Sequence, residues 1–185
     1  MHLCAQLDPI KNGLWYIGFK AGGEEFKIDC TRFDKLLLVF KDGHYKMIEL
    51  PEKLFVGPDL VYCGVPERDR VFTLAYTNRE ASYLKRFTFG GMIMDKEYFC
   101  IPPKSKILFF ALDTPDQLYI KYKPAPHQKV SQQTCKPGEL SVKSAKAIGP
   151  GQSRNGKDTF IRAPRTRASQ HLRTSRAIRP AGAVG

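Results

Sequence analysis

The chain lacks the cysteine pairs, histidine clusters and glycine-lysine motifs on which many metal and nucleotide sites depend. Its five cysteines are widely spread and odd in number, no C-x-x-C pair is present, and its four histidines are scattered. A zinc site is therefore not expected, and each cysteine is expected to be a reduced, buried thiol. No Gly-Lys-Ser/Thr sequence is present either, so the sequence predicts no phosphate-binding loop and no cofactor.

Long apolar runs and a helical period are also missing. No stretch reaches the length of a membrane-spanning helix, and the first eight residues do not resemble a signal peptide, so we expect a soluble, cytoplasmic protein. The paired acids Glu24–Glu25 and Asp113/Asp116 lie at expected turns, where acids are common. Because no Ser/His/Asp or Cys/His constellation can be assembled, we predict no catalytic residue and no metal ligand, and no enzyme activity for the chain on its own.

What the chain does have is a repeat. Three stretches begin with a wholly apolar run, pass through a polar turn and return in a strand that carries Tyr and Lys; they start at Leu36, Val71 and Ile107, in steps of 35 and 36 residues. Repeated hairpins at this period are typical of a propeller or a similar array and not of a single-core enzyme. We expect three hairpins, with the strands 35–40 and 45–50, 70–76 and 81–89, and 105–112 and 118–123.

Further strands are expected around these hairpins. Alternating and aromatic-rich segments predict a strand pair at 14–20 and 25–30, a unit at 53–57 turning into 60–65, and short strands at 95–101 and 140–143. The sequence thus predicts an all-β fold, with residues 1–13 as a lead-in, 14–126 as the array, 127–157 as a possible closing strand and linker, and 158–185 as a disordered basic tail. The tail has few large apolar residues, so it cannot bury enough surface to offset its ordering entropy.

Positive charge is concentrated at the end of the chain. Through Lys123 there are 18 Lys and Arg against 16 Asp and Glu, a net of +2, whereas from Pro124 onward there are 12 against 2, a net of +10. A polycationic segment favours a polyanionic partner, nucleic acid first and an anionic membrane second. Of the two we expect duplex DNA and no membrane. A solvated extension that keeps the protein soluble is the alternative interpretation.

Basic residues also recur on the return strand of each hairpin. If the hairpins stack as a curved array, Lys46, Lys85, Arg86 and Lys121 would occupy matching places on one rim and follow a phosphate backbone without reading bases. Lys41, Arg79 and Lys123 lie next to these positions and complete the set of expected DNA contacts. The alternative is that a lysine on an outer strand only discourages edge-to-edge pairing.

Several of these segments resemble a known family. The runs 22–30, 34–46 and 52–57, followed by 83–88, 95–98 and 119–124, are similar in order and spacing to the C-terminal region of the A-type subunit of bacterial type IIA topoisomerases (gyrase and topoisomerase IV), especially that of topoisomerase IV. The resemblance covers roughly residues 14 to 126. It implies a β-pinwheel, a propeller-like disc that binds and bends duplex DNA at its basic edge.

The resemblance also implies partners. In that family the disc presents DNA to a separate breakage-reunion core of the same A-type polypeptide, which acts together with the B-type polypeptide of the topoisomerase. Nothing resembling the Arg-Tyr dyad of that core precedes Leu14, so we expect a non-catalytic, nucleoid-associated part of an isomerase. The Gln-Arg-Arg-Gly-Gly-Lys-Gly box of gyrases does not occur, which disfavours active supercoiling. With three hairpin units we expect an open or incomplete disc.

Two other functions remain open on the sequence alone. The first is a propeller-like protein-interaction module in which only the basic tail contacts nucleic acid. The second is a compact β-domain hydrolase or nuclease, which would need convergent acids or metal ligands that the sequence does not offer.

Overall fold

The computed structural model describes residues 3–10, 14–21, 26–79, 81–122, 131–153 and 160–162. Within these ranges the regular structure is β-strand, apart from the single 3₁₀ turn η1 (Pro137–Glu139). The predicted all-β fold class is therefore confirmed. Among the described residues there is no helix with the length and apolar character needed to cross a bilayer.

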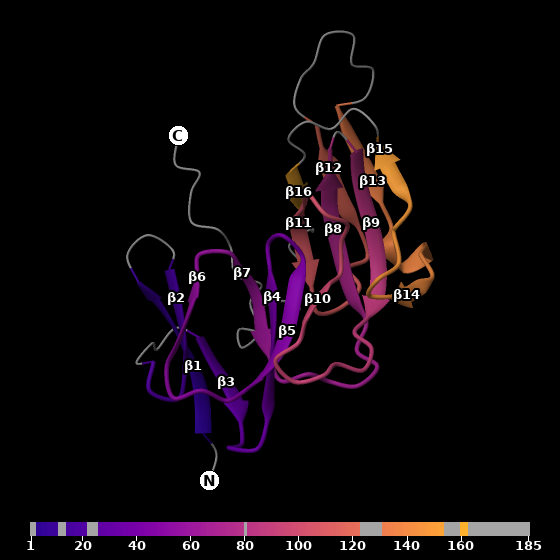
Figure 1. Cartoon of the computed structure of the whole chain (residues 1–185). Helices are drawn as coiled ribbons and strands as arrows, with labels where there is room; N and C mark the ends of the chain where they lie inside the picture. Colours follow the sequence, from indigo (N-terminus) through magenta and orange to yellow (C-terminus); the bar gives the residue numbers. More distant parts are fainter. Residues whose placement is uncertain are drawn as a thin grey trace.

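The strands form four small sheets (Figure 1). In the order in which the strands lie side by side, the first sheet holds β3 (Phe26–Cys30), β1 (Leu3–Ile10), β2 (Leu14–Gly18) and β6 (Leu54–Gly57). The second holds β10 (Glu97–Phe99), β5 (His44–Glu49), β4 (Lys35–Phe40) and β7 (Leu60–Gly64). The third holds β11 (Ser105–Ala111), β8 (Phe72–Asn78), β9 (Ala81–Thr88) and β14 (Val142–Ser144), and β15 (Gly151–Ser153) also pairs with β9. The fourth holds β13 (Gln132–Cys135), β12 (Leu118–Lys121) and β16 (Phe160–Arg162).

Two of the three expected hairpins form as predicted. β4 pairs antiparallel with β5, and β8 pairs antiparallel with β9. In the first hairpin the turn depends on Gly43, whose φ of +85° is readily adopted only by glycine, and on Asp42, whose Oδ1 accepts from the His44 backbone N–H at 3.1 Å. The apolar runs of these two hairpins, β4 and β8, are central strands of their sheets, whereas the third run lies in β11 at a sheet edge.

The core is divided into three layers, each between successive sheets. One cluster joins the first and second sheets, the largest joins the second and third, and the last joins the third and fourth. On β4 the even-numbered residues pack toward the first sheet and Leu37 and Val39 toward the third. A strand covered on both faces is apolar at every position, which explains the uninterrupted run Leu36–Phe40.

The strands at the edges of the sheets pair with other partners than predicted. The expected pair 54–57 and 60–65 is divided, because β6 pairs with β2 in the first sheet and β7 with β4 in the second. The expected third hairpin is also wrong: β11 pairs with β8, whereas β12 lies in the fourth sheet between β13 and β16. Neighbouring segments thus pair with different sheets, and we call this arrangement strand exchange. A sheet edge presents unpaired N–H and C=O groups, so a strand distant in sequence can pair there.

The beginning of the chain also differs from its prediction. The segment expected as a lead-in contains β1, which pairs with both β2 and β3, so these two strands flank it and do not pair with each other. Toward the end, a strand was predicted at 140–143, and β14 forms there at 142–144, so the prediction is confirmed in part. β16 is a strand inside the segment expected to be disordered, and most of the remaining tail lies outside the described residues.

Candidate nucleic-acid interface

Lys46 and Lys85 occupy matching places in two successive sheets, as the repeat predicted. Lys46 lies opposite Leu38 in the β4–β5 hairpin, and Lys85 lies opposite Leu74 in the β8–β9 hairpin. Both leucines are fully buried and pack toward the preceding sheet. The two lysines nevertheless have different surroundings: Lys46 is half-buried and lies opposite Glu97 of β10, whereas Lys85 is only 1% exposed.

Lys85 is not a rim residue, which corrects the sequence-based expectation. Its ammonium donates to the carbonyl oxygens of Cys100, Ala145 (2.7 Å) and Ala147 (3.0 Å), and it lies 4.8 Å from the centre of the Phe87 ring. All three ammonium protons are therefore used inside the protein. Burial lowers the pKa of Lys85 to about 8, because a charged amine is costly away from water. With its three protons donated to carbonyls, Lys85 does not donate a hydrogen bond to a phosphate at the rim.

Arg86 points to the other face of β9 and is also engaged within the protein. Its Nε donates to the Thr114 hydroxyl at 3.0 Å, and its Nη1 donates to the carbonyls of Gly138 (3.2 Å) and Leu140 (2.9 Å). These bonds fasten the η1 segment to the third sheet. The guanidinium is half-buried, so Arg86 is first of all a structural residue.

The other expected contacts lie at the surface or outside the described residues. Lys121, the last residue of β12, is exposed, and so are Lys41 and Arg79 at the tips of the two central hairpins. Lys123 lies outside the described residues. Lys46, Lys85, Arg86 and Lys121 consequently do not form one continuous row.

A different set of cations is brought together by the strand exchange. The Lys41 carbonyl accepts from the Ile107 N–H at 2.8 Å, which holds the β4–β5 tip against β11. Asn78, just before Arg79, donates through Nδ2 to the Pro103 carbonyl (3.2 Å) and the Ser105 hydroxyl (2.7 Å). Three separate segments therefore meet at one edge of the second and third sheets. We call the exposed cations there the tip cluster: Lys41, Arg79, Lys104 and Lys106.

The tip cluster is available to an outside anion. None of its four members forms an ion pair with another residue in the ranges that the structure describes. The nearby Asp42 carboxylate lies 2.5 Å from His44 Nδ1. Lys104 lies three residues before Ile107, whose N–H is bonded to the Lys41 carbonyl. In an extended chain these three residues span roughly 10 Å, which sets the length of the cluster along β11. A duplex presents about three phosphates per strand over that length, so several phosphates can face the cluster at once.

The sequence indicated only half of this cluster. Lys41 and Arg79 were predicted from their places in the hairpins, but Lys104 and Lys106 were missed. The available signal was the turn after Pro102-Pro103, where two lysines flank a residue that begins β11. Arg79 and Lys104 both adopt positive φ, at 54° and 62°, as expected for residues in tight turns.

The thiols are not set up for chemistry, although Cys100 lies beneath the β4–β5 turn, where its Sγ donates to the Gly43 carbonyl at 3.2 Å. Burial raises the pKa of Cys100 to about 12, and it also raises the pKa of Cys63 and Cys135, so these thiols are protonated at neutral pH. Within the part of the chain that the structure describes, no three His, Cys, Asp or Glu side chains gather as a metal site would require.

With this geometry established, the chain can be compared with known proteins. The family described as topoisomerase C-terminal domain, Bacteroidota, matches residues 17–154, which include strands of all four sheets but not β1 or β16. No curated protein matches the chain, and no solved structure does.

Proposed function

The chain belongs to the topoisomerase C-terminal domain family of Bacteroidota, and from this premise we propose that it binds duplex DNA without sequence preference and bends it. The DNA would lie along the edge formed by the tip cluster and be presented to the breakage-reunion core of a type IIA topoisomerase. In this proposal the fold is an incomplete β-pinwheel of four sheets and belongs to the A-type polypeptide. The whole enzyme, an isomerase that also contains the B-type polypeptide, acts on the nucleoid in the cytoplasm.

One observation supports this function above the others. Strand exchange gathers four exposed cations from three segments at one edge, although residues up to Lys123 carry a net charge of only +2. Lys and Arg held in this way neutralise phosphates and release counterions, which gives binding that is tolerant of sequence and sensitive to salt. Lys46 and Lys121 are proposed as flanking contacts, with Lys123 beyond them. Arg86 is proposed only as a secondary DNA contact, because its guanidinium already donates hydrogen bonds within the protein.

The test is a neutralised variant in which Lys41, Arg79, Lys104 and Lys106 are all changed to Gln. We expect weaker binding to a linear duplex, and a salt dependence that becomes shallower by about 3 to 4 in log–log slope, at roughly 0.9 per lost phosphate contact. The matched control removes the same charge at exposed lysines elsewhere, namely Lys20, Lys35, Lys53 and Lys136. If both quadruple variants lose affinity equally, the edge has no special role and only net charge matters.

The alternative is a protein-interaction module whose tail alone contacts nucleic acid. It is favoured by the composition of residues 163–185, which contain five Arg and no Asp or Glu. A deletion after Arg162 distinguishes the two functions, because it removes the tail and retains β13, β14 and β16. Under our proposal the shortened chain still retards duplex DNA at low salt. Loss of all retardation would favour the alternative.

A further inference from the structure

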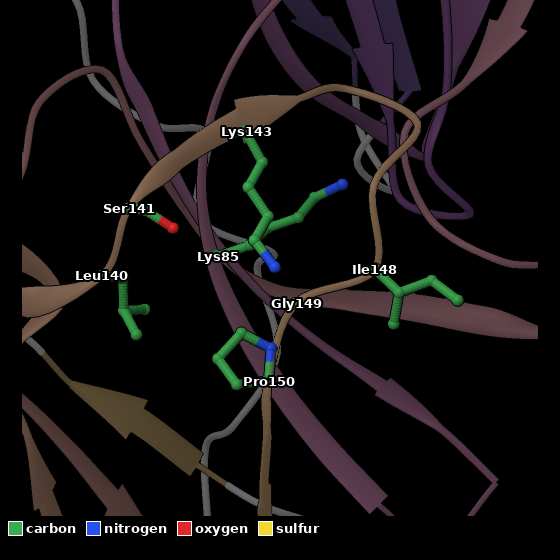
Figure 2. A pocket seen from close by; sticks show the side chains of 7 residues that line it. All are labelled: Lys85, Leu140, Ser141, Lys143, Ile148, Gly149 and Pro150. Carbon is green, nitrogen blue, oxygen red and sulfur yellow. The ribbon is translucent and has the colours of Figure 1, made fainter.

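Away from the tip cluster, the third sheet contains a cavity of about 210 Å³ beside Lys85 (Figure 2). β14 pairs with residues 86–88 of β9, and β15 pairs with residues 82 and 83, so Leu84 and Lys85 lie in the gap between them. The cavity occupies that gap. Its lining residues are Lys85, Leu140, Ser141, Lys143, Ile148, Gly149 and Pro150.

The chain passes unusually close to β9 on one side of this cavity. A Cβ at Gly149 would lie 2.5 Å from the Leu84 carbonyl oxygen and 2.9 Å from the Lys85 Cβ, so a larger residue does not fit there. The Pro150 carbonyl accepts from the Leu84 N–H at 3.4 Å. The wall is thus held by backbone contacts, and the cavity is part of the fold.

The charged residues that line the cavity are both lysines, Lys85 and Lys143. Lys143 is exposed at its rim, Ser141 adds a hydroxyl, and none of the seven lining residues is acidic. Behind them lies the Lys85 ammonium, whose partners are three neutral carbonyls. It has no ion pair with any residue in the described ranges. A buried charge without a counterion is uncommon in proteins, and an anion nearby would stabilise it.

The other titratable groups near Lys85 do not supply that negative charge. The Cys100 thiol remains protonated, because burial raises its pKa to about 12. Tyr76, on the same face of the third sheet, has its pKa raised by burial as well, and its hydroxyl lies against the backbone of Gly149 without a hydrogen-bond partner of normal geometry. Tyr83 stacks on Tyr76, and Lys143 adds a second positive charge.

We propose that this cavity binds a tetrahedral oxyanion of the phosphate type. The Lys143 ammonium and the Ser141 hydroxyl donate to the anion, while Lys85 provides a fixed positive charge behind the wall. A water molecule occupies about 30 Å³ in the liquid, so the space accommodates an oxyanion together with some of its hydration. The inference rests on this cavity and is independent of DNA binding at the tip cluster.

The first experiment titrates sulfate into the full chain at constant ionic strength, with backbone amide NMR shifts as the readout. Sulfate has the phosphate geometry, and its charge does not change between pH 6 and 10. We expect saturable shifts in residues 140–150 and about tenfold weaker binding in Lys143→Gln, since a charge-assisted hydrogen bond is lost. Lys146→Gln is the matched control, because Lys146 is exposed in the same segment but does not line the cavity. Equal affinity in both variants, or no saturable shift, would overturn the proposal.

The second experiment tests the part played by Lys85. If its charge supports the anion, sulfate affinity falls as the pH rises from 7 to 9.5 and the ammonium loses its proton. Lys85→Met removes this dependence and lowers the affinity at pH 7. Should sulfate affinity in the unaltered chain be constant over this range, the role of Lys85 is excluded.

A third experiment determines whether the oxyanion is a phosphodiester of DNA or a free ion. A short duplex that displaces sulfate, and that binds Lys143→Gln less tightly, identifies the ligand as a DNA phosphodiester. A duplex that binds both chains equally and leaves sulfate in place identifies a free oxyanion.

Discussion

The Lys85 ammonium donates a hydrogen bond of 2.7 Å to the carbonyl of Ala145, 60 residues later in the chain. The same ammonium also reaches the carbonyls of Cys100 and Ala147. One side chain on β9 thus holds both the segment that follows β10 and the segment that follows β14. This gives a buried lysine a structural purpose in a protein whose other cations are mostly at the surface.

Replacing Lys85 by Met is expected to lower the free energy of unfolding by about 2 kcal/mol. The substitution nearly preserves volume but leaves three buried carbonyls without their donor, each a cost of roughly 1–3 kcal/mol that is offset in part because a charge no longer has to be buried. Urea unfolding measures the change. Lys46→Met, at the matching place in the preceding hairpin, is the control and should change stability by less than about 0.5 kcal/mol.

Lys85 also predicts a pH dependence. Because burial lowers its pKa from 10.5 to about 8, the folded chain releases this proton near pH 8 while the unfolded chain retains it to above pH 10. The contribution of Lys85 to the free energy of unfolding therefore increases with pH in that window. Buried thiols such as Cys100 act in the opposite direction, but they stay protonated in both folded chains between pH 8 and 9 and therefore cancel in this comparison. Between pH 8 and 9 the stability of the original chain should rise relative to Lys85→Met by about 1 kcal/mol. A constant difference would show that the folded chain keeps the Lys85 proton to above pH 9, and it would contradict the lowered pKa.

Gly149→Ala is expected to destabilise the protein by about 2 kcal/mol. The added Cβ would be 2.5 Å from the Leu84 carbonyl oxygen, so the backbone of the segment between β14 and β15 must move away from β9. Thermal or urea unfolding detects the loss, and faster amide exchange in residues 142–150 locates it. Gly138→Ala is the control, since a Cβ there meets nothing within 4 Å.

Arg86→Lys separates a structural role from a DNA contact. The substitution retains the positive charge but loses the fork that joins Thr114, Gly138 and Leu140, so stability should fall by about 1–2 kcal/mol. Duplex affinity, measured below the unfolding transition, should remain within about twofold. The reverse result, weaker binding with unchanged stability, would show that Arg86 serves mainly as a DNA contact.

The sequence was sufficient for the central hairpins and insufficient for the edges. Leu36–Phe40 and the turn at Asp42-Gly43 carry their own signals, namely apolar residues on both faces and a positive φ that glycine supplies. By contrast, the turn at 113–117 has the length and composition of a hairpin loop, yet it joins β11 and β12 of different sheets. The residue composition of a loop predicts that the chain turns there, but it does not predict which sheet edge each flanking strand pairs with.

The error at Lys85 has a different origin. Tyr83, Lys85 and Phe87 alternate along β9 and share one face, so the sequence already placed the lysine among aromatic residues on a face that is buried. A lysine is almost never fully buried without partners, and that general rule made the rim the natural expectation. The partners are backbone carbonyls of residues 100, 145 and 147, which no side-chain pattern reveals.

The strand exchange has a mechanical consequence if the chain holds DNA, a stiff polymer, as proposed. The stretch from β10 to β11 leaves the second sheet, carries Lys104 and re-enters the third. A force applied to Lys104 is therefore resisted by the backbone hydrogen bonds of both sheets, so neither sheet edge separates alone. If a curved duplex lies along this edge, as proposed, both sets of hydrogen bonds together oppose the elastic force of the bent DNA.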